Sequence, residues 1–599
     1  MAARLDGAIA PLLGGSARSE VDVQRYWVRI VVGVATVVSV IVLLAASNSL
    51  QGKPGIITPQ LAGLQVFDAA CGVTFHPETC MKTLLPYHRA HSSKPEELTR
   101  IVLSSASEGV RNTLTAVRAH KGNNGIGFPG SRVCQQTLMS SIEQLEASLE
   151  MLSELGSDVS QYPFETLKTR LSAAMEFHTT CIDALVETSA LESHIVETKH
   201  HTEELLSNAL AFVEALSIYG SNLLSWKHSK GANADSNLED NFTPIQNSRV
   251  FVTSSEAESS TSYPSWMSSE QQKSLFADLP SDVVVAKDGS GKYKSIQSAI
   301  KHARKSGSAT AKRYVIRIKA GVYNEQVIVP QNATNFMFIG DGVGKTILTG
   351  DKSVGKTPGM TTFLSASLIV EGPGFIGKAI TVRNTAGADG FQAVAMRVSA
   401  DMAAFYDCVF DGFQDTLYTH TFRQYYRDLT VMGTVDFIFG NGAVAFQNCT
   451  IIAKKPPLVG QQNTYTAQGK TDLGQATGLS FQSCTFDGTP ELKANKATFK
   501  TYLGRPWKPY STHVNLKCNL MEHIDPEGWL PWNTSDYGLK TSFFAEWQDF
   551  GPGANTAKRV WWSKQITDKS VAQKYQAVPF TQADKWVPAT SIPLTRDLP

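Results

Sequence analysis

Residues 392–440 read QAVAMRVSADMAAFYDCVFDGFQDTLYTHTFRQYYRDLTVMGTVDFIFG. In this stretch Gln392 and Gln414 stand 22 residues apart, and Asp415 and Asp436 stand 21 residues apart. A nearly constant interval of this length falls within the range of solenoid repeats. Residues one full coil apart in a parallel β-helix are stacked neighbours, so we expect the two amides and the two carboxylates to meet on one face. Many short strands could also form a sandwich or a barrel, and in a sandwich the interval has no such meaning.

The sequence around this stretch has the same character from about residue 280 onward. Short β-rich runs such as YVIRI (314–318) and FMFIG (336–340) alternate with Gly, Asn and Asp turns. Long helical periodicity is nearly absent until the end of the chain. The second half is therefore predicted to be a β domain of many short strands.

The first half has a different pattern. Between about 66 and 226, apolar residues recur at helical spacing, as at Ile142, Leu145, Leu149 and Leu152. Several such helices joined by short polar loops predict a small bundle. It has no cluster of titratable residues of catalytic type, so a binding or regulatory role is expected. Residues 227–279 are rich in Ser, Asn and Glu and are predicted to be a linker.

An uncharged apolar run, IVVGVATVVSVIVLLAA, occupies residues 30–46 and follows Arg25 and Arg29. A cleaved signal peptide, an uncleaved signal anchor and a buried core helix could each produce it. The run is longer than a usual cleaved signal core and lies further from the N-terminus, which favours the anchor. Basic residues before it predict that residues 1–29 are cytoplasmic and that the rest enters the secretory pathway as a type II protein.

Cysteine usage fits an oxidising compartment. Four of the eight cysteines precede residue 200 and four follow residue 400, which predicts two independently bridged units. Glycosylation sequons begin at Asn241, Asn332, Asn448 and Asn533, and the one at Asn448 is doubtful because its middle residue is a cysteine. The net charge of +1 gives no reason to expect a nucleic-acid partner.

Five blocks of the β part carry a resemblance to a known family. These blocks are GVYNE (321–325), QAVAMR (392–397), QDTLY (414–418), DFIFG (436–440) and LGRPW (503–507). Their order and intervals resemble those of plant pectin methylesterases, and the resemblance covers roughly 280–599. The helical part at 66–226, with Cys71/Cys80 and Cys134/Cys181, resembles the inhibitor domain that precedes many such enzymes. The resemblance implies a right-handed parallel β-helix catalytic domain, preceded by an all-α four-helix bundle. The apolar run at 30–46 adds the expected N-terminal membrane-anchor helix.

The resemblance also implies an activity, the hydrolysis of the C6 methyl esters of pectin in the plant cell wall. Asp436 would be the nucleophile, and Asp415 would be the general acid and then the base. Gln392 and Gln414 would stabilise the oxyanion, and Arg505 would orient Asp436. The expected substrate contacts are Thr362, Gln392, Arg505 and Trp507.

The same resemblance implies disulfides at Cys71–Cys80, Cys134–Cys181 and Cys449–Cys484. Leu429 stands where the family often has a cysteine that pairs with the counterpart of Cys408. We therefore expect Cys408 to be free or to pair with Cys518. The stretch SSEQQKSLF (268–276) lacks the dibasic cleavage site of many relatives, so the helical domain is expected to stay attached and to be autoinhibitory.

Other chemistries fit the sequence less well. It has no G-x-S-x-G, no H-E-x-x-H and no paired Cys/His spacing for a metal, so no cofactor or metal is expected. Pectin is the expected partner, together with the membrane through 30–46 and a possible proteinaceous inhibitor, and we expect a monomer. The competing hypothesis is a catalytically silent wall-binding or inhibitor protein.

Overall fold

The computed structural model describes residues 66–87, 94–119, 129–155, 162–220, 222, 226, 280–305 and 313–598. The expected cytoplasmic tail (1–29), membrane anchor (30–46) and linker (227–279) lie outside these residues, as does the sequon at Asn241. No helix within the described ranges is both long enough and apolar enough to span a bilayer.

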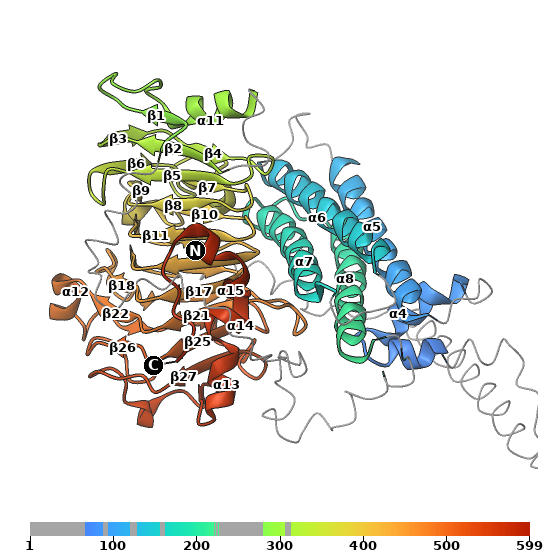
Figure 1. Ribbon diagram of the computed structural model, residues 1–599. Coiled ribbons are helices and arrows are strands. Elements are labelled where there is room, and N and C mark those ends of the chain that lie inside the picture. The colour runs from blue at the N-terminus through green and yellow to red at the C-terminus, as the bar shows by residue number, and fades with distance from the viewer. Residues whose placement is uncertain are drawn as a thin grey trace, which may run out of the picture. The chain divides into compact units, whose positions relative to one another are not determined.

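Five helices make up most of the described N-terminal region. They are α4 (Pro77–Leu84), α5 (Pro95–Ala119), α6 (Pro129–Ser153), α7 (Phe164–Glu187) and α8 (Ser193–Tyr219). The four long helices, α5 to α8, run alongside one another and share one apolar core (Figure 1). The two disulfides expected here are present, Cys71–Cys80 and Cys134–Cys181, and the second joins α6 to α7.

Helix α7 differs from an ordinary amphipathic surface helix, because every residue from Leu171 to Ile182 is buried. A helix that is covered on all sides needs a second packing partner besides its bundle. The partner is the β region, as the contacts described below establish.

The β region consists mainly of three large parallel sheets whose strands lie one above another (Figure 1), and β19 (Asn463–Thr464) pairs with β23 (Thr501–Tyr502) in a separate two-stranded sheet. The chain visits the sheets in turn, so most strands of the large sheets pair with the strand three or four places later in sequence. The seven-stranded sheet contains β4 (Val327–Val329), β7 (Leu368–Val370), β10 (Met396–Val398), β13 (Leu417–Tyr418), β16 (Ile438–Gly440), β20 (Thr466–Gln468) and β24 (Arg505–Pro506). All its pairings are parallel, which agrees with the predicted solenoid of stacked coils.

The two other sheets complete each coil. The eleven-stranded sheet contains β1 (Val283–Val285), β2 (Tyr314–Ile318), β5 (Phe336–Gly340), β8 (Ile376–Lys378), β11 (Ala403–Tyr406), β14 (Arg423–Arg427), β17 (Ala443–Gln447), β21 (Gly478–Gln482), β25 (Thr512–Leu516), β27 (Phe543–Trp547) and β28 (Lys564–Gln565). The eight-stranded sheet contains β3 (Gly321–Asn324), β6 (Thr346–Gly350), β9 (Thr381–Asn384), β12 (Val409–Asp411), β15 (Thr430–Gly433), β18 (Thr450–Ala453), β22 (Thr485–Gly488) and β26 (Asn519–Leu520).

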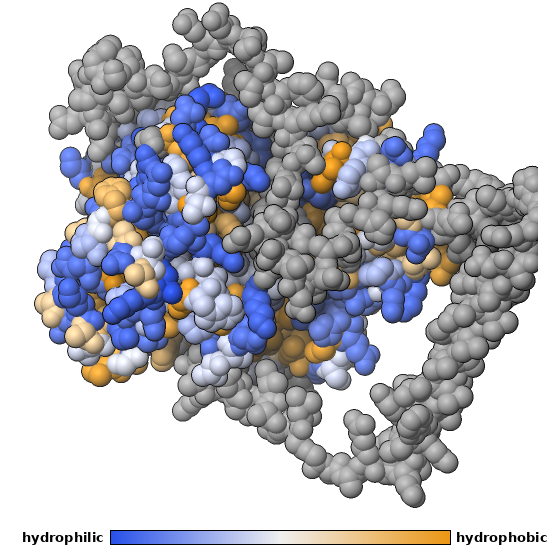
Figure 2. Space-filling view, turned by 90° about the horizontal axis from the view of Figure 1, so that it is seen from below, coloured by the Kyte–Doolittle hydropathy of each residue, from blue (hydrophilic) through white to orange (hydrophobic). Residues whose placement is uncertain are grey.

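The core of the solenoid is a ladder of like side chains. Phe405, Tyr426, Phe446 and Phe481 stack in succession, with ring centroids 5.2, 4.6 and 4.6 Å apart. These separations match the spacing of neighbouring strands, so each coil adds one ring to the stack. On the face seen in Figure 2, hydrophilic residues cover most of the coloured surface and hydrophobic residues are scattered among them.

Short helices cover parts of the β region. The helix α11 (Ile296–Lys305) lies at the end where the solenoid begins, beside β1 (Figure 1). Near the C-terminus, α13 (Lys569–Lys574), α14 (Ala577–Thr581) and α15 (Ala583–Trp586) follow the last strand, and α15 packs Trp586 against Tyr425 of the eleven-stranded sheet. A further helix, α12 (Pro490–Ala494), follows β22.

The four cysteines of the β region are free and buried. The expected Cys449–Cys484 bridge is absent, which corrects that prediction; both thiols instead lie within hydrogen-bonding range of backbone carbonyl oxygens. Residues 408, 429, 449, 484 and 518 each begin the turn into the eight-stranded sheet on successive coils. Cys408 and Cys518 are therefore four coil steps apart, about 19 Å at the usual strand spacing, which rules out a bridge between them.

Candidate active site

The register of the seven-stranded sheet brings the two predicted carboxylates together. Leu417 of β13 pairs with Ile438 of β16, and Asp415 and Asp436 each stand two residues before these partners. The backbone N–H of Asp415 donates to the carbonyl of Val435, 3.1 Å away. The 21-residue interval is thus one coil, as predicted from the sequence.

Both aspartates have left-handed backbones, with φ of 62° at Asp415 and 51° at Asp436. Residues with a Cβ adopt this conformation at a cost of about 1–3 kcal/mol, and such strain is concentrated at functional sites. Both side chains are buried, with exposures of 7% and 5%.

Asp436 is held by a two-pronged ion pair. Arg505 donates from Nε to Oδ1 at 2.8 Å and from Nη2 to Oδ2 at 2.5 Å. Thr464 donates from Oγ1 to Oδ1 at 2.6 Å and accepts from the backbone N–H of Asp436. A bidentate guanidinium fixes a carboxylate in both position and orientation. The predicted contact between Arg505 and Asp436 is therefore present.

Two residues of this cluster were missed from the sequence. Thr464 stands 28 residues after Asp436, outside the 21–22 interval, because the coil from β16 to β20 is longer. The ring of Trp532 lies 4.4 Å from the Arg505 guanidinium and comes from a loop beyond the seven-stranded sheet. Neither the coil interval nor the family blocks contain a signal for them.

Asp415 has a different environment from its neighbour. Burial raises the pKa of its carboxyl well above the usual range, and the negative charges of Asp436 and Glu187 raise it further, against the opposing effect of Arg505. Burial and a like charge both favour the neutral carboxylic acid. Asp415 can thus give up a proton at a pH at which an exposed aspartate has none to give.

The predicted amides lie on adjoining coils. The backbone N–H of Ala393 donates to the carbonyl of Gln414 at 3.2 Å, so Gln392 and Gln414 are near neighbours across one coil step. Both are half-buried. The Oε1 atom of Gln392 is buried without a hydrogen-bond partner.

The other two predicted substrate contacts are engaged by the helical region. The backbone N–H and Oγ1 of Thr362 donate to Glu187 of α7 at 3.0 and 2.8 Å. Trp507 packs edge-on against Phe439, and the Nζ of Lys508 lies 4.9 Å from the Trp507 ring centroid. The same Nζ pairs with Asp183 of α7 at 2.8 Å.

These contacts belong to a continuous line of polar residues on α7, which we call the docking stripe. It comprises Ser172, Glu176, Thr180, Asp183 and Glu187, at spacings of 4, 4, 3 and 4 residues. Residues at this spacing lie on one face of a helix. Each bonds to the β region, the first three to Gln475, Asn441 and His420. The helical spacing of these residues is visible in the sequence, but the spacing alone does not show that they face the β region.

Two buried ionisable groups meet in the docking stripe. Asn441 donates from Nδ2 to Oε2 of Glu176 at 3.0 Å, and burial raises the pKa of Glu176 to about 8. His420 bonds to Thr180 at 2.8 Å, and burial holds its pKa well below the usual value. Among the described residues no group of His, Cys, Asp and Glu has the arrangement of a metal site.

Comparison with known proteins gives this arrangement a family. A family model described as Pectinesterase matches residues 282–584, and one described as Plant invertase/pectin methylesterase inhibitor matches residues 65–212. The chain is 46% identical over 338 residues to Pectinesterase 2 of Citrus sinensis, a match that covers 56% of this chain and 64% of that protein.

Two further matches extend this result. Probable pectinesterase/pectinesterase inhibitor 21 of Arabidopsis thaliana is 32% identical over 594 residues, covering 96% of this chain and 83% of that protein. The solved structure called Pectin methylesterase from Carrot is 44% identical with a TM-score of 0.50, covering 53% of this chain and 98% of that one. Since the first model spans half of the chain and the Arabidopsis relative is matched over most of its length, the chain belongs to the pectinesterase family and carries an N-terminal domain of the pectin methylesterase inhibitor family.

Proposed function

We propose that this protein hydrolyses the C6 methyl esters of pectin, yielding a free uronate carboxylate and methanol. The observation that carries the proposal is the pair of aspartates one coil apart, of which Asp436 is gripped by Arg505 and Asp415 has a strongly raised pKa. Ester hydrolysis through an aspartyl acyl-enzyme needs one ionised carboxylate as nucleophile and one protonated group as acid. The environments of Asp436 and Asp415 suit these two roles respectively.

The reaction starts with attack of an Asp436 oxygen on the ester carbonyl carbon. The carbonyl oxygen takes the negative charge and accepts hydrogen bonds from Gln392 and Gln414; one such donor is typically worth about 10²–10³ in rate. The tetrahedral intermediate then loses methanol, whose oxygen receives the proton of Asp415. This leaves an acyl-enzyme on Asp436.

The second half returns the enzyme to its starting state. Asp415, now a carboxylate, takes a proton from a water molecule, which attacks the acyl carbon. The acyl bond to Asp436 breaks, the uronate product leaves, and Asp415 keeps the proton for the next cycle. Thr362 and Trp507 complete the proposed substrate contacts, with Trp507 offering a flat face to a sugar ring.

The domain limits that follow are 66–226 for the inhibitor-like bundle, 227–279 for the linker and 280–599 for a right-handed β-helix. The docking stripe supports autoinhibition in the same chain, because Glu187 occupies the hydrogen-bonding groups of Thr362 and Asp183 occupies Lys508 beside Trp507. A bound bundle and a pectin chain would compete for these groups.

The proposed location is the secretory pathway and the cell wall, with residues 30–46 as a signal anchor. Asn332 and Asn533 are exposed, which supports their use as glycosylation sites. A shift in electrophoretic mobility on glycosidase treatment, lost in the double Asn→Gln variant, tests the sites.

The activity is tested by methanol release from highly methylated pectin by the full-length chain. Asp436→Asn should abolish release while the thermal unfolding midpoint stays within a few degrees, and Lys517→Gln, which removes a charge from the turn into the eight-stranded sheet, should leave release unchanged. Methanol release by Asp436→Asn at the wild-type rate would disprove the mechanism. The non-catalytic alternative would be favoured if chains that keep all the candidate catalytic residues released no methanol, whether the helical bundle was docked or displaced.

A further inference from the structure

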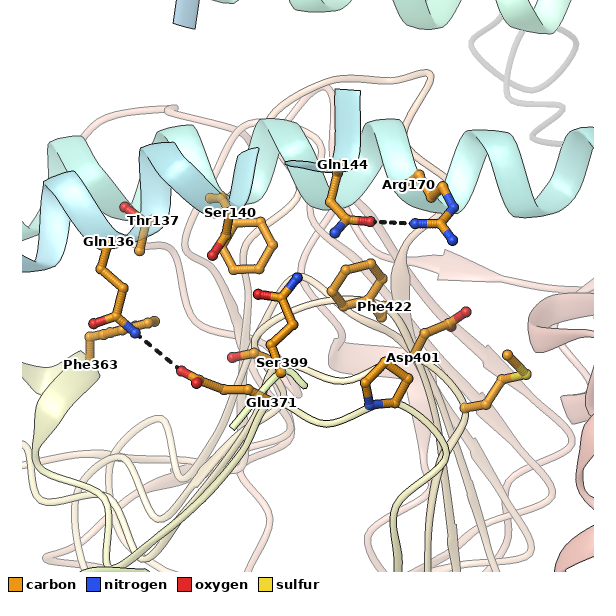
Figure 3. A pocket seen from close by; sticks show the side chains of 14 residues that line it. Gln136, Thr137, Ser140, Gln144, Arg170, Phe363, Glu371, Ser399, Asp401 and Phe422 are labelled. Atoms are coloured by element: carbon orange, nitrogen blue, oxygen red, sulfur yellow. Dashed lines mark hydrogen bonds between the residues drawn. The ribbon is translucent and has the colours of Figure 1, made fainter. Parts of the chain in front are cut away.

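A hollow lies between the helical region and the β region, apart from the aspartates. It has a volume of about 300 Å³ and is walled by α6 and α7 on one side and by turns of the β region on the other (Figure 3). Its β wall includes Ser399 and Asp401, which follow β10, and Phe422, which follows β13. Asp415 and Asp436 instead precede β13 and β16, at the opposite ends of the strands. We call this hollow the interface pocket.

We infer that the interface pocket binds a sugar that bears a free carboxylate, namely a uronate unit of de-esterified pectin. The inference rests on the proposed function, which makes that unit the product of the reaction. None of the residues assigned to catalysis lines the pocket. It would therefore be a product-recognition site separate from the site of chemistry.

The first argument is charge. Both carboxylates in the pocket wall are neutralised: Arg423 grips Asp401 from Nε at 2.9 Å and Nη2 at 2.6 Å, and Arg397 pairs with Glu371 at 2.8 Å. Arg170 of α7 has no carboxylate partner among the described residues. It donates only to the amide oxygen of Gln144 at 2.9 Å, and its Nε is buried without a partner (Figure 3).

An unpaired guanidinium in a half-buried pocket favours an anion that accepts two hydrogen bonds, and a carboxylate fits its fork. In the contact to Gln144 only the donor is charged, whereas a carboxylate would pair a charged acceptor with the charged guanidinium and could bind it through two hydrogen bonds. The pocket thus carries one uncompensated positive charge at a defined position.

The second argument is the rest of the lining. The rings of Phe177, Phe363 and Phe422 form apolar walls, and the first and last are edge-to-face with centroids 6.0 Å apart. The side chains of Gln136, Thr137 and Ser140 supply amide and hydroxyl groups from α6 (Figure 3). A sugar has C–H groups that pack against aromatic rings and hydroxyl groups that form hydrogen bonds, so it suits a pocket with both kinds of lining. Inorganic phosphate has no apolar surface for the rings and suits the pocket poorly.

Phe422 adds a third observation. Its φ is 68°, and a bulky residue with a Cβ rarely adopts the left-handed region. The solenoid holds this strained turn with an aromatic side chain directed against Phe177 of α7. The Phe422 ring therefore packs at the interface with the helical region and not in the interior of the solenoid.

A ligand held by both walls must favour the docked arrangement. By linkage, a free ligand concentration one hundred times the dissociation constant raises the docking equilibrium constant roughly one-hundredfold. Accumulating product would in this way strengthen autoinhibition, which gives the pocket a regulatory consequence.

The test is calorimetric titration of the full-length chain with trigalacturonic acid and, separately, with its trimethyl ester. Arg170→Gln should weaken binding of the acid at least tenfold and change binding of the ester little. The matched control is Arg132→Gln, which removes the same charge from an exposed position of α6. Phe422→Ala is the second variant and should weaken both ligands, and circular dichroism establishes that each variant is folded.

The outcomes separate the two hypotheses. Equal binding of the acid by Arg170→Gln and the wild type would overturn the inference. So would loss of binding in Trp507→Ala but not in Arg170→Gln, since the ligand would then lie in the catalytic cleft. The proposed function is tested separately. It would fail if the chain bound trigalacturonic acid through Arg170 but released no methanol from methylated pectin.

Discussion

Replacing Glu176 by Gln should remove a pH dependence from autoinhibition. Glu176 lies in the middle of the docking stripe, fully buried against Asn441. Its pKa is about 8 when docked, because burial penalises the charge, and would return to about 4.5 on exposure. The docked form therefore binds the proton more tightly. Below pH 4.5 both forms are protonated and docking carries no penalty; above it, docking weakens progressively until pH 8.

The size of the effect follows from linkage. One pKa unit corresponds to about 1.4 kcal/mol, and between pH 6.5 and pH 8 the docking free energy should weaken by roughly 1.6 kcal/mol, about a fifteenfold change in the docking constant. Glu187 has a raised pKa at the same interface and acts in the same direction. His420 acts oppositely below about pH 6.5, since it is held neutral when docked and gains a proton when exposed. An exposed His420 still titrates in the lower part of the window, but wild type and Glu176→Gln share this residue, so its contribution cancels in the ratio of the two.

Other charges near Glu176 come as a pair. Asp183 raises its pKa and Lys508 lowers it, and the two are bonded to each other across the interface. The ion pair of Asp183 and Lys508 is broken when the bundle undocks. These two residues therefore alter the size of the change in the pKa of Glu176 and not its sign. Gln at position 176 keeps an oxygen that can accept from Asn441, so the variant should dock at every pH in the window.

The assay is methanol release by the full-length chain from pH 6.5 to pH 8, expressed as the ratio of wild type to Glu176→Gln at each pH. The ratio cancels the titration of Asp415, which both proteins share. It should rise about tenfold or more across the window, while the ratio of wild type to Glu150→Gln, an exposed position of α6, stays flat. A flat ratio for Glu176→Gln would refute the reasoning, because the buried carboxyl would then not be coupled to docking.

Three further changes test other parts of the structure. Glu187→Ala should raise methanol release by the full-length chain about tenfold or more, since hydrogen bonds to a charged group are worth about 1.5–3 kcal/mol; unchanged release would mean that the Thr362 contact does not hold the bundle in place. Asp415→Asn should lower release by about 10²–10⁴ by removing the proton donor, with substrate binding retained in equilibrium dialysis, and a smaller loss would assign the acid to another group. Titration with a thiol reagent in denaturant should find four reactive thiols per chain, and a count of two would restore the Cys449–Cys484 bridge.

The cluster around Asp415 and Asp436 could be predicted from the sequence because a solenoid converts a sequence interval into a spatial contact. Asp415 and Asp436 are one coil apart, and no long-range folding decision intervenes. Thr464 belongs to the same cluster but was missed, because the longer coil before β20 breaks the interval. The Cys449–Cys484 bridge failed for a different reason: stacking makes two sulfurs neighbours, but neighbouring thiols need not be oxidised.

The docking stripe could not be predicted from the sequence. Its five residues have ordinary helical spacing, yet the sequence cannot say whether polar residues at that spacing face water or another domain. The deciding fact is that the middle of α7, from Leu171 to Ile182, is buried on all sides, which depends on packing between segments 175 to 325 residues apart. Burial then changes the chemistry of the stripe, since Glu176 would be an unremarkable carboxylate on an exposed helix. A buried acid such as Glu176 suits an interface that must both form and open. In its protonated form it can be buried without a partner charge, and its ionisation opposes burial and so favours undocking. The interface that occupies the hydrogen-bonding groups of Thr362 therefore contains a group, Glu176, whose ionisation should favour their release.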